Sequence, residues 1–440
     1  MDISSNKKLK HPEIAHRLKA IRKTQKKSQQ YIADLLGIGV PKMINIENSR
    51  DEYDQSDIDV LVKDLGVEGV PLTDEQVAYS MKRIAHLSLA LASGNFVEAK
   101  ATLEEQAPAL HLKDTDLELV LLYKLNNVDY LLSQGEVEQA KQEMKALSKK
   151  YKDMDDRHRY HYYHNEGRIL FRSLDYKKGI EVFKKAHGIA ENNKDFNSIF
   201  TYRAASNIGY GYSELNYPNA AITFLEKATK GNFESNGLNA FYFFANKVLG
   251  SNYAKIGMIK RAEKLIYKAL DYSESVGNEF YIASSHYDLG KIYTYSEDWD
   301  KGKEHFEKAR TLFEKGSEYY MWSSYNKAEC MIGNREFKSA EKLMEEVETL
   351  YIDNEKAKNR LEWLKSMHSI SKGITQDKEE DVQYLLNEAI PNLLENHFIL
   401  EAIKTYELLA EHFERTVQRM KAGEMYKEVN KLRKRLNADI

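Results

Sequence analysis

The sequence has few of the residues that interrupt helices or cross-link chains. Its 440 residues include 6 prolines, 22 glycines and 1 cysteine. So few helix breakers leave little room for the turns of an all-β protein or the loops of a parallel α/β sheet, and long helices are expected. The single thiol, Cys330, excludes an internal disulfide and a multi-thiolate metal site, which fits a reducing cytoplasm.

Long apolar runs are also missing. The longest runs, such as residues 119–123, are far shorter than the roughly 20 residues that cross a bilayer. The first residues carry charge but no apolar stretch of signal-peptide length. We therefore expect a cytoplasmic protein with no membrane partner. Its 42% hydrophobic and 30% charged residues are typical of a folded chain.

The net charge of -3 hides three regions of different charge. Residues 1–50 carry 11 basic and 4 acidic side chains, residues 51–75 carry 1 basic and 9 acidic, and the rest is nearly neutral. A basic head on a neutral body suggests nucleic acid, because phosphate neutralisation with counterion release needs clustered Lys and Arg. A solvated, lysine-rich N-terminus is the simpler alternative, and charge alone does not decide between them.

Residues 1–65 have the apolar spacing of four short amphipathic helices. Gly37 and Gly39 mark a turn between the second and third, and Pro41 falls in the first turn of the third, where its missing N–H costs nothing. Residues 28–48 resemble the helix-turn-helix of the phage-repressor-like (XRE/Cro) family. The matching residues are Gln29, Ala33, Gly37, Ile46 and Glu47.

This resemblance implies double-stranded DNA as a partner of residues 1–65. The residues expected at the DNA are Gln29, Gln30, Val40, Lys42, Asn45, Lys26, Lys27 and Arg50. The basic residues among them, together with Lys19, Arg22 and Lys23, are expected at phosphates. Val40 and Pro41 offer only apolar contact, for example to a thymine methyl, where the family usually has polar side chains. A helix-turn-helix kept for packing or for protein binding is the alternative.

Residues 66–75 read as a linker, because a Gly- and Pro-containing segment is followed by a capping box that opens a new helix at Thr73. Beyond it, residues 76–440 repeat. The segment around Gly250 places small residues where two antiparallel helices cross, and it resembles the tetratricopeptide (TPR) repeat. HEAT repeats have a similar length, but the order of Gly290, Tyr293, Phe306 and Ala309 favours TPR.

The position of Gly250 recurs about every 40 residues. The recurring positions, which we call anchors, are Leu87, Val128, Gly167, Gly209, Gly250, Gly290, Ala328, Ile370 and Ala410. Twelve residues after them stand Ala99, Ala140, Gly179, Ala221, Ala262, Gly302, Ala340, Val382 and Ala422. The pattern predicts nine helical pairs in a right-handed superhelix, with the first helix of each pair lining a concave groove. The eighth pair departs furthest from the pattern.

Amides and aromatics cluster near the anchors on the first helix of each pair. A carboxamide can donate to one backbone group of an extended peptide and accept from another. The residues expected to bind a peptide are Asn126, Asn165, Arg168, Arg203, Asn207, Tyr210, Asn246, Lys247, Tyr287, Tyr325 and Asn326. Alternatively, any one of these asparagines occupies an ordinary polar position, in solvent or between helices, and does not bind a peptide.

No catalytic or cofactor arrangement stands out. His158, His161 and His164 lie on one helix stripe, but no Cys, Asp or Glu completes a metal shell, so we expect groove or packing roles. No glycine-rich phosphate loop, activated nucleophile or pair of inward carboxylates is found. We expect neither an enzyme nor a bound metal or other cofactor.

The whole chain resembles the Rap/Rgg/NprR/PlcR/PrgX (RRNPP) family of Gram-positive peptide-sensing regulators, with an NprR-like architecture. The resemblance implies a cytoplasmic quorum-sensing transcription regulator, a homodimer or higher homo-oligomer, switched by a short signalling peptide in the TPR groove. Two alternatives remain open. One is a Rap-like protein that sequesters a response regulator or other protein, with a degenerate helix-turn-helix. The other is a plain TPR scaffold with a vestigial head.

Overall fold

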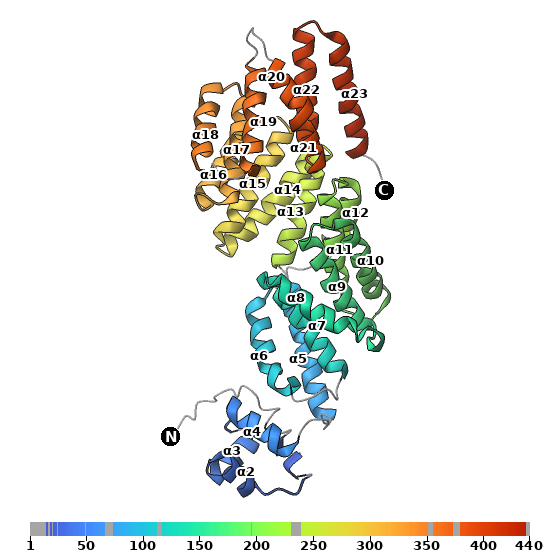
Figure 1. The fold of residues 1–440 in the computed structure, drawn as a ribbon, viewed down its shortest axis with the longest axis vertical. Coiled ribbons are helices and arrows are strands. Elements are labelled where there is room, and N and C mark those ends of the chain that lie inside the picture. Colours follow the sequence, from blue (N-terminus) through green and yellow to red (C-terminus); the bar gives the residue numbers. More distant parts are fainter. Residues whose placement is uncertain are drawn as a thin grey trace. The chain divides into compact units, whose positions relative to one another are not determined.

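The computed structural model describes residues 15, 18–19, 21–23, 25–48, 50–66, 74–111, 117–194, 196–229, 239–350, 355–372 and 379–436. These residues form helices and no strand, which confirms the all-α class (Figure 1). None of the helices described here has the length and apolar character needed to cross a membrane. The chain divides into two compact units, residues 1–200 (unit 1) and residues 201–440 (unit 2).

The N-terminal head of unit 1 contains α2 (Gln29–Leu36), α3 (Val40–Glu47) and α4 (Gln55–Leu65). Ser28 caps α2, since its side chain accepts a hydrogen bond from the Tyr31 N–H at 3.0 Å. Gly37 ends α2 in the left-handed conformation, with φ at 66°, and this lets the chain turn into α3 within three residues. The predicted second and third helices and their glycine turn are confirmed.

The head has its own apolar core. Ile32 and Ala33 of α2, Met43 and Ile46 of α3, and Leu61 of α4 are all 1% exposed or less. The first predicted helix is described only in part, at residues 15, 18–19 and 21–23, and its Ile14 lies outside the described residues. Most of the predicted linker, residues 67–73, also lies outside them.

From residue 74 onward, the described helices follow one another in nine pairs, as the repeat predicted. In unit 1 they are α5 (Asp74–Ser93) and α6 (Phe96–His111), α7 (Leu117–Gln134) and α8 (Val137–Ser148), and α9 (Asp156–Arg172) and α10 (Tyr176–Asn192). A short 3-10 turn, Tyr151–Asp153, precedes α9. Helix α11 (Ser198–Glu214) begins in unit 1 and continues into unit 2, where α12 (Pro218–Thr229) completes its pair.

Unit 2 holds the remaining five pairs of the described chain. They are α13 (Asn239–Lys255) and α14 (Ile259–Ser275), α15 (Glu279–Tyr295) and α16 (Trp299–Leu312), α17 (Glu318–Gly333) and α18 (Phe337–Leu350), α19 (Glu355–Ser371) with α20 (Glu379–Tyr384) and α21 (Ile390–Glu395), and α22 (Ile399–Arg415) and α23 (Arg419–Leu436). We call the first helix of each pair the A helix. Every predicted anchor lies on an A helix, and every residue twelve positions later lies on its partner.

Glycine anchors allow the paired helices to touch. A Cβ atom added to Gly290 would lie 2.7 Å from a ring carbon of Phe306, sixteen residues later. A Cβ on Gly250 would lie equally close to Ile266, at the same spacing, and Gly167 and Gly209 are crowded in the same way. Such distances are too short for real contacts, so the close crossing of each of these pairs requires glycine.

The eighth pair is the irregular one, as the sequence indicated. Its second helix is split, with a π-helical turn at Leu385–Ala389 between α20 and α21. Pro391 lies two residues after this turn, and its nitrogen carries no hydrogen for the carbonyl four residues earlier. In this pair neither packing residue, Ile370 or Val382, is small, whereas every other pair has Ala or Gly at the second position, and both residues are buried.

Candidate functional site

A buried carboxylate fixes the predicted recognition helix α3. The Glu47 side chain is fully buried and accepts hydrogen bonds from Arg22 Nε at 2.6 Å and Arg22 Nη2 at 2.9 Å. Gln29 Nε2 donates to the same carboxylate at 2.7 Å. Arg22 is 7% exposed, so it belongs to the interior of the head, and the prediction that it contacts phosphate was wrong.

Three more of the residues expected at DNA have partners within the head. Lys19 Nζ donates to the Glu47 carbonyl at 3.0 Å and to Asn48 Oδ1 at 3.1 Å. Lys27 forms an ion pair with Asp64 at 2.6 Å and lies over the ring of Tyr31, and this carboxylate raises the pKa of Lys27. Val40 packs partly against the core of the head. The remaining expected contacts are exposed: Lys23, Lys26, Gln30, Lys42, Asn45 and Arg50.

Along the A helices of unit 1, side chains about one repeat apart are hydrogen-bonded to each other. Ser88 Oγ donates to Asn126 Oδ1 at 2.8 Å. Asn165 Nδ2 donates to the Leu125 carbonyl at 2.7 Å, and Arg168 forms an ion pair with Asp129. The predicted groove residues Asn126 and Asn165 are thus buried where neighbouring A helices meet.

Two of the predicted asparagines have an oxygen atom without a hydrogen bond among the described residues. Asn165 uses only its Nδ2 atom, and Asn246 donates Nδ2 to the Tyr242 carbonyl at 2.8 Å. The Oδ1 atoms of both residues are buried and lack a partner. A buried amide oxygen is costly to leave without a donor, so each is a position where a ligand N–H would be stabilised.

Unit 1 has a cavity of about 200 Å³ on its A helices. Its walls come from α5, α7, α9 and the start of α11, and they are mostly apolar with one arginine. The lining residues are Met81, Ala85, Ser88, Leu89, Leu122, Arg157, His161, Phe196, Asn197 and Phe200. Of these residues, only His161 was given a groove or packing role from the sequence. Ser88 and the others were not predicted, because periodicity does not show which A-helix positions leave space between them.

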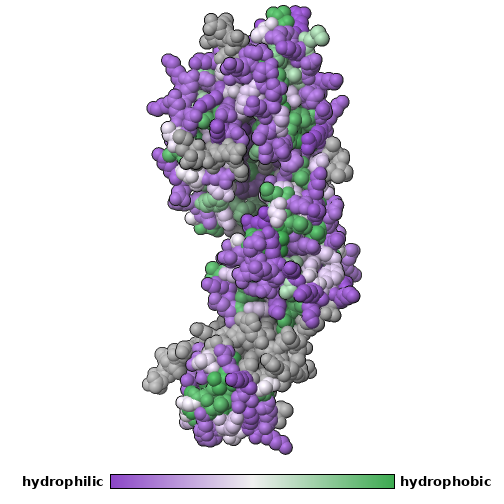
Figure 2. Space-filling model, viewed as in Figure 1, coloured by the Kyte–Doolittle hydropathy of each residue, from purple (hydrophilic) through white to green (hydrophobic). Residues whose placement is uncertain are grey.

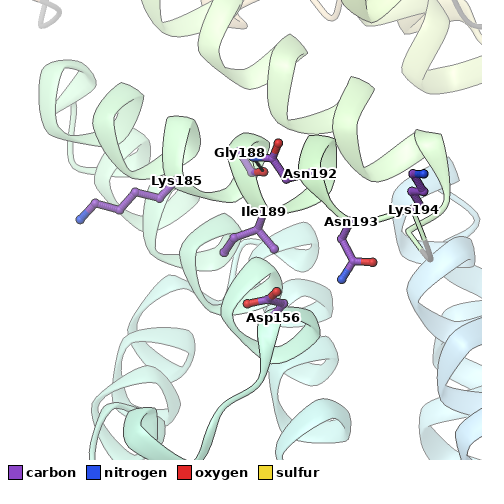
Figure 3. A pocket seen from close by; sticks show the side chains of 7 residues that line it. All are labelled: Asp156, Lys185, Gly188, Ile189, Asn192, Asn193 and Lys194. Atoms are coloured by element: carbon purple, nitrogen blue, oxygen red, sulfur yellow. Dashed lines mark hydrogen bonds between the residues drawn. The ribbon is translucent and has the colours of Figure 1, made fainter.

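A second depression, of about 490 Å³, lies at the end of α10. Its lining is mainly polar, with Lys185, Asn192, Asn193 and Lys194 around Ile189, and Asp156 contributes from the start of α9 (Figure 3). None of the residues predicted to bind peptide lines it.

The histidine stripe on α9 is a packing feature. His158 Nδ1 lies 2.6 Å from Asp155 Oδ1, and Nε2 lies 2.8 Å from the Glu118 carbonyl. His161 and His164 are buried against the ring of Tyr160. In the part of the chain that the structure describes, no group of three or more His, Cys, Asp or Glu side chains could hold a metal ion.

In unit 2 the predicted residues lie along four successive A helices, α11, α13, α15 and α17. Lys247 on α13 contacts Asp288 on α15 at 3.1 Å and also donates to Ser284. Asn326 on α17 donates to the Tyr287 hydroxyl at 3.0 Å. Tyr325 is 1% exposed and belongs to the core. Arg203 and Asn207 are partly buried and Tyr210 is 39% exposed, all three on α11.

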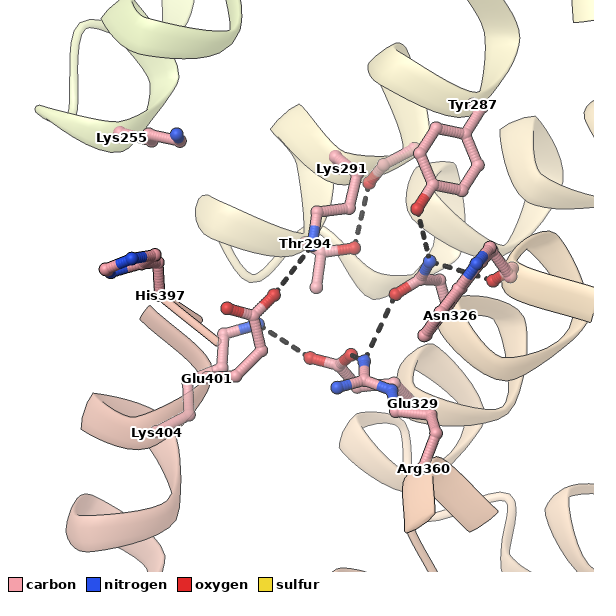
Figure 4. A network of polar contacts seen from close by, with 12 residues as sticks. Lys255, Tyr287, Lys291, Thr294, Asn326, Glu329, Arg360, His397, Glu401 and Lys404 are labelled. Carbon is pink, nitrogen blue, oxygen red and sulfur yellow. Dashed lines mark hydrogen bonds and ion pairs between the residues drawn. The ribbon is translucent and has the colours of Figure 1, made fainter. Parts of the chain in front are cut away.

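A network of ion pairs connects these A helices to α22 (Figure 4). Lys291 on α15 contacts Glu401 on α22 at 2.8 Å. Lys404, one turn along α22, contacts Glu329 on α17 at 2.7 Å. Arg360 on α19 binds the other oxygen of the Glu329 carboxylate at 2.9 Å.

The two carboxylates and Arg360 are buried, and Lys291 and Lys404 are partly buried. Burial by itself would raise the pKa of Glu401, but Lys291 and Arg360 outweigh burial, and the pKa of Glu401 is lowered far below its usual range. Burial would lower the pKa of Lys291, yet Glu401 holds it well above its ordinary value. Lys255, at the end of α13, differs because burial dominates and lowers its pKa.

Lys291, Glu401 and Lys404 were not predicted from the sequence. They are single charged residues on amphipathic helices, and such residues are usually solvated. Lys291 and Glu401 are 110 positions apart. Only the fold brings them together, so no local pattern signals them.

Comparison with solved structures gives high similarity over most of the chain. The apo form of the quorum sensor NprR from B. thuringiensis aligns with a TM-score of 0.63 at 20% identity, over 80% of this chain and 98% of that one. A Rap protein complexed with competence and sporulation factor aligns with a TM-score of 0.64 at 13% identity, over 82% and 99%. The chain has the fold of these proteins.

NprR in complex with its cognate peptide NprX is also similar, with a TM-score of 0.57 at 21% identity, over 80% of this chain and 99% of that one. No protein-family model matches the sequence, and no curated protein matches it. The structural neighbours agree with the RRNPP-type fold that the sequence suggested, and at these identities the likeness concerns the fold.

Proposed function

We propose that this chain is a cytoplasmic transcription regulator that binds double-stranded DNA through its head and is switched by a short signalling peptide bound along the A helices. It acts as a homodimer or higher homo-oligomer. The observation that carries the proposal is the pair of buried amide oxygens on Asn165 and Asn246. Each lies on an A helix and lacks the donor that the N–H of an extended peptide supplies.

Two further features support a peptide ligand. The cavity of about 200 Å³ in unit 1 has the size and apolar lining to receive one side chain. NprR and a Rap protein, whose fold this chain shares, have been solved with a bound peptide or signalling factor. Within unit 1, Asn165 and two lining residues of the cavity, Arg157 and His161, lie on the same helix, α9.

The exposed side chains of α3 support DNA binding. Lys42 and Asn45 are exposed on the predicted recognition helix, and Lys26 and Arg50 are exposed nearby in sequence. Glu47 accepts hydrogen bonds from both Arg22 and Gln29, so the position of α3 is fixed by buried groups and its exposed residues remain available. A rigid helix with a few polar readers is what base-edge recognition requires.

A second candidate function has its own observation. Ile44 on α3 and Leu35 on α2 are each 38% exposed, and Figure 2 shows hydrophobic side chains gathered on the surface of the N-terminal helices. An exposed apolar surface of this kind suits a protein partner. In this alternative the protein sequesters a response regulator or another protein, as a Rap-like protein would.

Fragmented genomic DNA, retained on the purified full chain at low and moderate salt, distinguishes the two functions. A regulator retains discrete sites at moderate salt, and the double variant Lys42→Ala/Asn45→Ala loses them. The exposed variant Gln139→Ala, far along the chain on α8, is the matched control and keeps them. Diffuse, salt-sensitive retention that is equal in all three proteins would reject DNA recognition and favour the protein partner.

Peptide binding is tested separately with a cytosolic peptide extract. Asn207→Ala/Asn246→Ala is expected to weaken retention of the bound peptide while the circular dichroism spectrum and melting temperature stay close to wild type. Asn246→Ala removes one of the two buried amide oxygens that lack a hydrogen-bond donor. Unchanged peptide retention in this variant would contradict the assignment of the A-helix asparagines.

A further inference from the structure

The ion-pair network of unit 2 joins four cations to two carboxylates. Lys255, Lys291, Lys404 and Arg360 surround the two carboxylates of Glu401 and Glu329, from α13, α15, α22 and α19. Another carboxylate, Glu214, also attracts Lys255. The Glu401 side chain is 9% exposed, so its pairing with Lys291 is well shielded from water.

Lys255 is the cation with the least compensation. Its Nζ atom donates to the Ser213 carbonyl at 3.3 Å and to Asn216 Oδ1 at 3.2 Å, which are both neutral acceptors. Burial lowers the pKa of Lys255, against the attraction of Glu214 and Glu401 and with the repulsion of Lys291. An ammonium in this position gains more than the other cations from an additional carboxylate.

The turn before α22 helps to position Glu401 near these lysines. The turn before α22 has His397 in the left-handed conformation, with φ at 63°, and Asn216 donates to the His397 carbonyl. Figure 4 shows Lys255 and His397 on the same side of the network, beside Glu401. The Asn216 side chain therefore contacts both Lys255 and the start of α22.

We propose that Lys255 and Lys291 form a carboxylate-binding site on the A helices of unit 2, and that Glu401 of α22 occupies this site until a ligand carboxylate replaces it. This inference rests on the proposed peptide function and names the chemistry of one peptide group. The carboxylate comes from the peptide C-terminus or from an acidic side chain.

Replacement of one carboxylate by another keeps Lys291 paired. A neutral ligand would leave the partly buried Lys291 without its anion, which is unfavourable. Glu401 leaves together with α22, which loses its ion pair to α15, so binding at this site changes the position of the last helical pair. A ligand shifts the equilibrium between the two positions of the last helical pair only to the extent that it binds one of them more tightly. Here the tighter binding comes from the exchange of carboxylates.

Chemical rescue tests the site without any peptide. In Glu401→Ala, removal of the carboxylate is expected to speed hydrogen exchange of α22 by about tenfold. Acetate at constant ionic strength, with chloride as the comparison salt, is expected to restore protection. Glu411→Ala, an exposed change on the same helix, should show neither effect. The exchange variant Lys291→Glu/Glu401→Lys keeps an ion pair and should protect α22 even if Glu401→Ala folds poorly.

Three pools of synthetic pentapeptides then test the ligand. The first has a free C-terminus and no Asp or Glu, the second is amidated and carries one Glu, and the third is amidated without any acid. The full chain is expected to retain the first or the second about tenfold more tightly than the third, and the favoured pool identifies the source of the carboxylate. Lys291→Gln should remove that preference, and Glu401→Gln should strengthen it.

The outcomes separate this inference from the proposed function. If acetate fails to protect α22 in Glu401→Ala, the carboxylate site is rejected whatever the peptides do. If acetate protects α22 but no pool is retained by any variant, the site stands and the peptide function fails. Equal retention of all three pools would support a peptide groove and overturn a role for this site in ligand binding.

Discussion

Two buried glutamates organise the two units in different ways. In the head, Glu47 is held by the fork of Arg22 and by Gln29, whose positions are 25 and 18 residues away. In unit 2, Glu401 is held by Lys291, whose position is 110 residues away. An arginine fork fixes the direction of a carboxylate through two parallel bonds, whereas a lysine ammonium attracts it as a point charge. The first arrangement suits a permanent structural contact and the second suits exchange.

The largest expected effect comes from breaking the first arrangement. Glu47→Ala leaves Arg22 buried without its anion and is expected to lower the stability of the head by about 3 to 5 kcal/mol. Hydrogen exchange of residues 25–66 in the full chain measures the loss. Gln30→Ala, which removes only an exposed hydrogen bond to Asp34, is the control and should change little. A loss as small as the control's would show that the two glutamates do not differ in this way.

Packing around Lys291 gives the next effect. Gly290 lies beside it on α15, and a Cβ there would meet Phe306 at 2.7 Å. Gly290→Ala is expected to destabilise unit 2 by about 1 to 3 kcal/mol through overpacking. Gly423→Ala on α23, where a Cβ would meet nothing within 4 Å, should instead stabilise by about 0.5 to 1 kcal/mol. Thermal unfolding measures the stability change in both variants. A change of the same sign in both would contradict this prediction.

A smaller effect is confined to acid pH. Because the pKa of Glu401 is lowered in the folded protein, the unfolded state binds the proton more readily there. The stabilisation is fully present above the ordinary glutamate pKa, about 4.3, and decreases as pH falls below it. Urea unfolding between pH 6 and pH 3 should show a steeper loss for wild type than for Glu401→Gln. Parallel pH profiles would mean that Lys291 does not hold the ionised form.

The smallest expected effect is a change in the rate at which the Cys330 thiol is labelled, which reports the opening of unit 2. Burial raises the pKa of the Cys330 thiol to about 12, and the side chain is 0% exposed next to Glu329 of the network. A maleimide at pH 8 is expected to label the native protein no faster than unit 2 unfolds. Glu401→Ala should speed labelling, while Glu47→Ala should not. Equal labelling rates in the two variants would contradict the difference between the two units.

The sequence predicts the frame of the molecule well. The anchors from Leu87 to Ala410 locate every A helix, because a close helix crossing permits few residue types and so leaves a periodic trace. Gly37 and Ser28 mark helix ends through local backbone chemistry. The eighth pair is weakly marked for the same reason, since Ile370 and Val382 replace the small residues on which the pattern depends.

The site is predicted less completely. Asn126 was placed on the correct helix, but whether its side chain meets a ligand or the next repeat depends on Ser88, 38 residues earlier. Arg22 looks like a phosphate contact in a basic segment, and only the folded head shows that Glu47 buries it. The pairing of Lys291 with Glu401 depends on how four successive helical pairs are arranged in space. No local spacing in the sequence contains that information. The peptide- and DNA-contact assignments remain predictions.

The hydrogen bonds between successive A helices also bear on how such an array can change its length. Each joins a different couple of residues: a serine to an asparagine, an asparagine to a carbonyl, an arginine to an aspartate, an asparagine to a tyrosine. A deletion of one whole pair would preserve every crossing of small residues, yet it would set unmatched polar groups against each other in a buried place. The pairs share a shape but have a fixed order, so this array cannot be shortened or shuffled as a string of identical units could be.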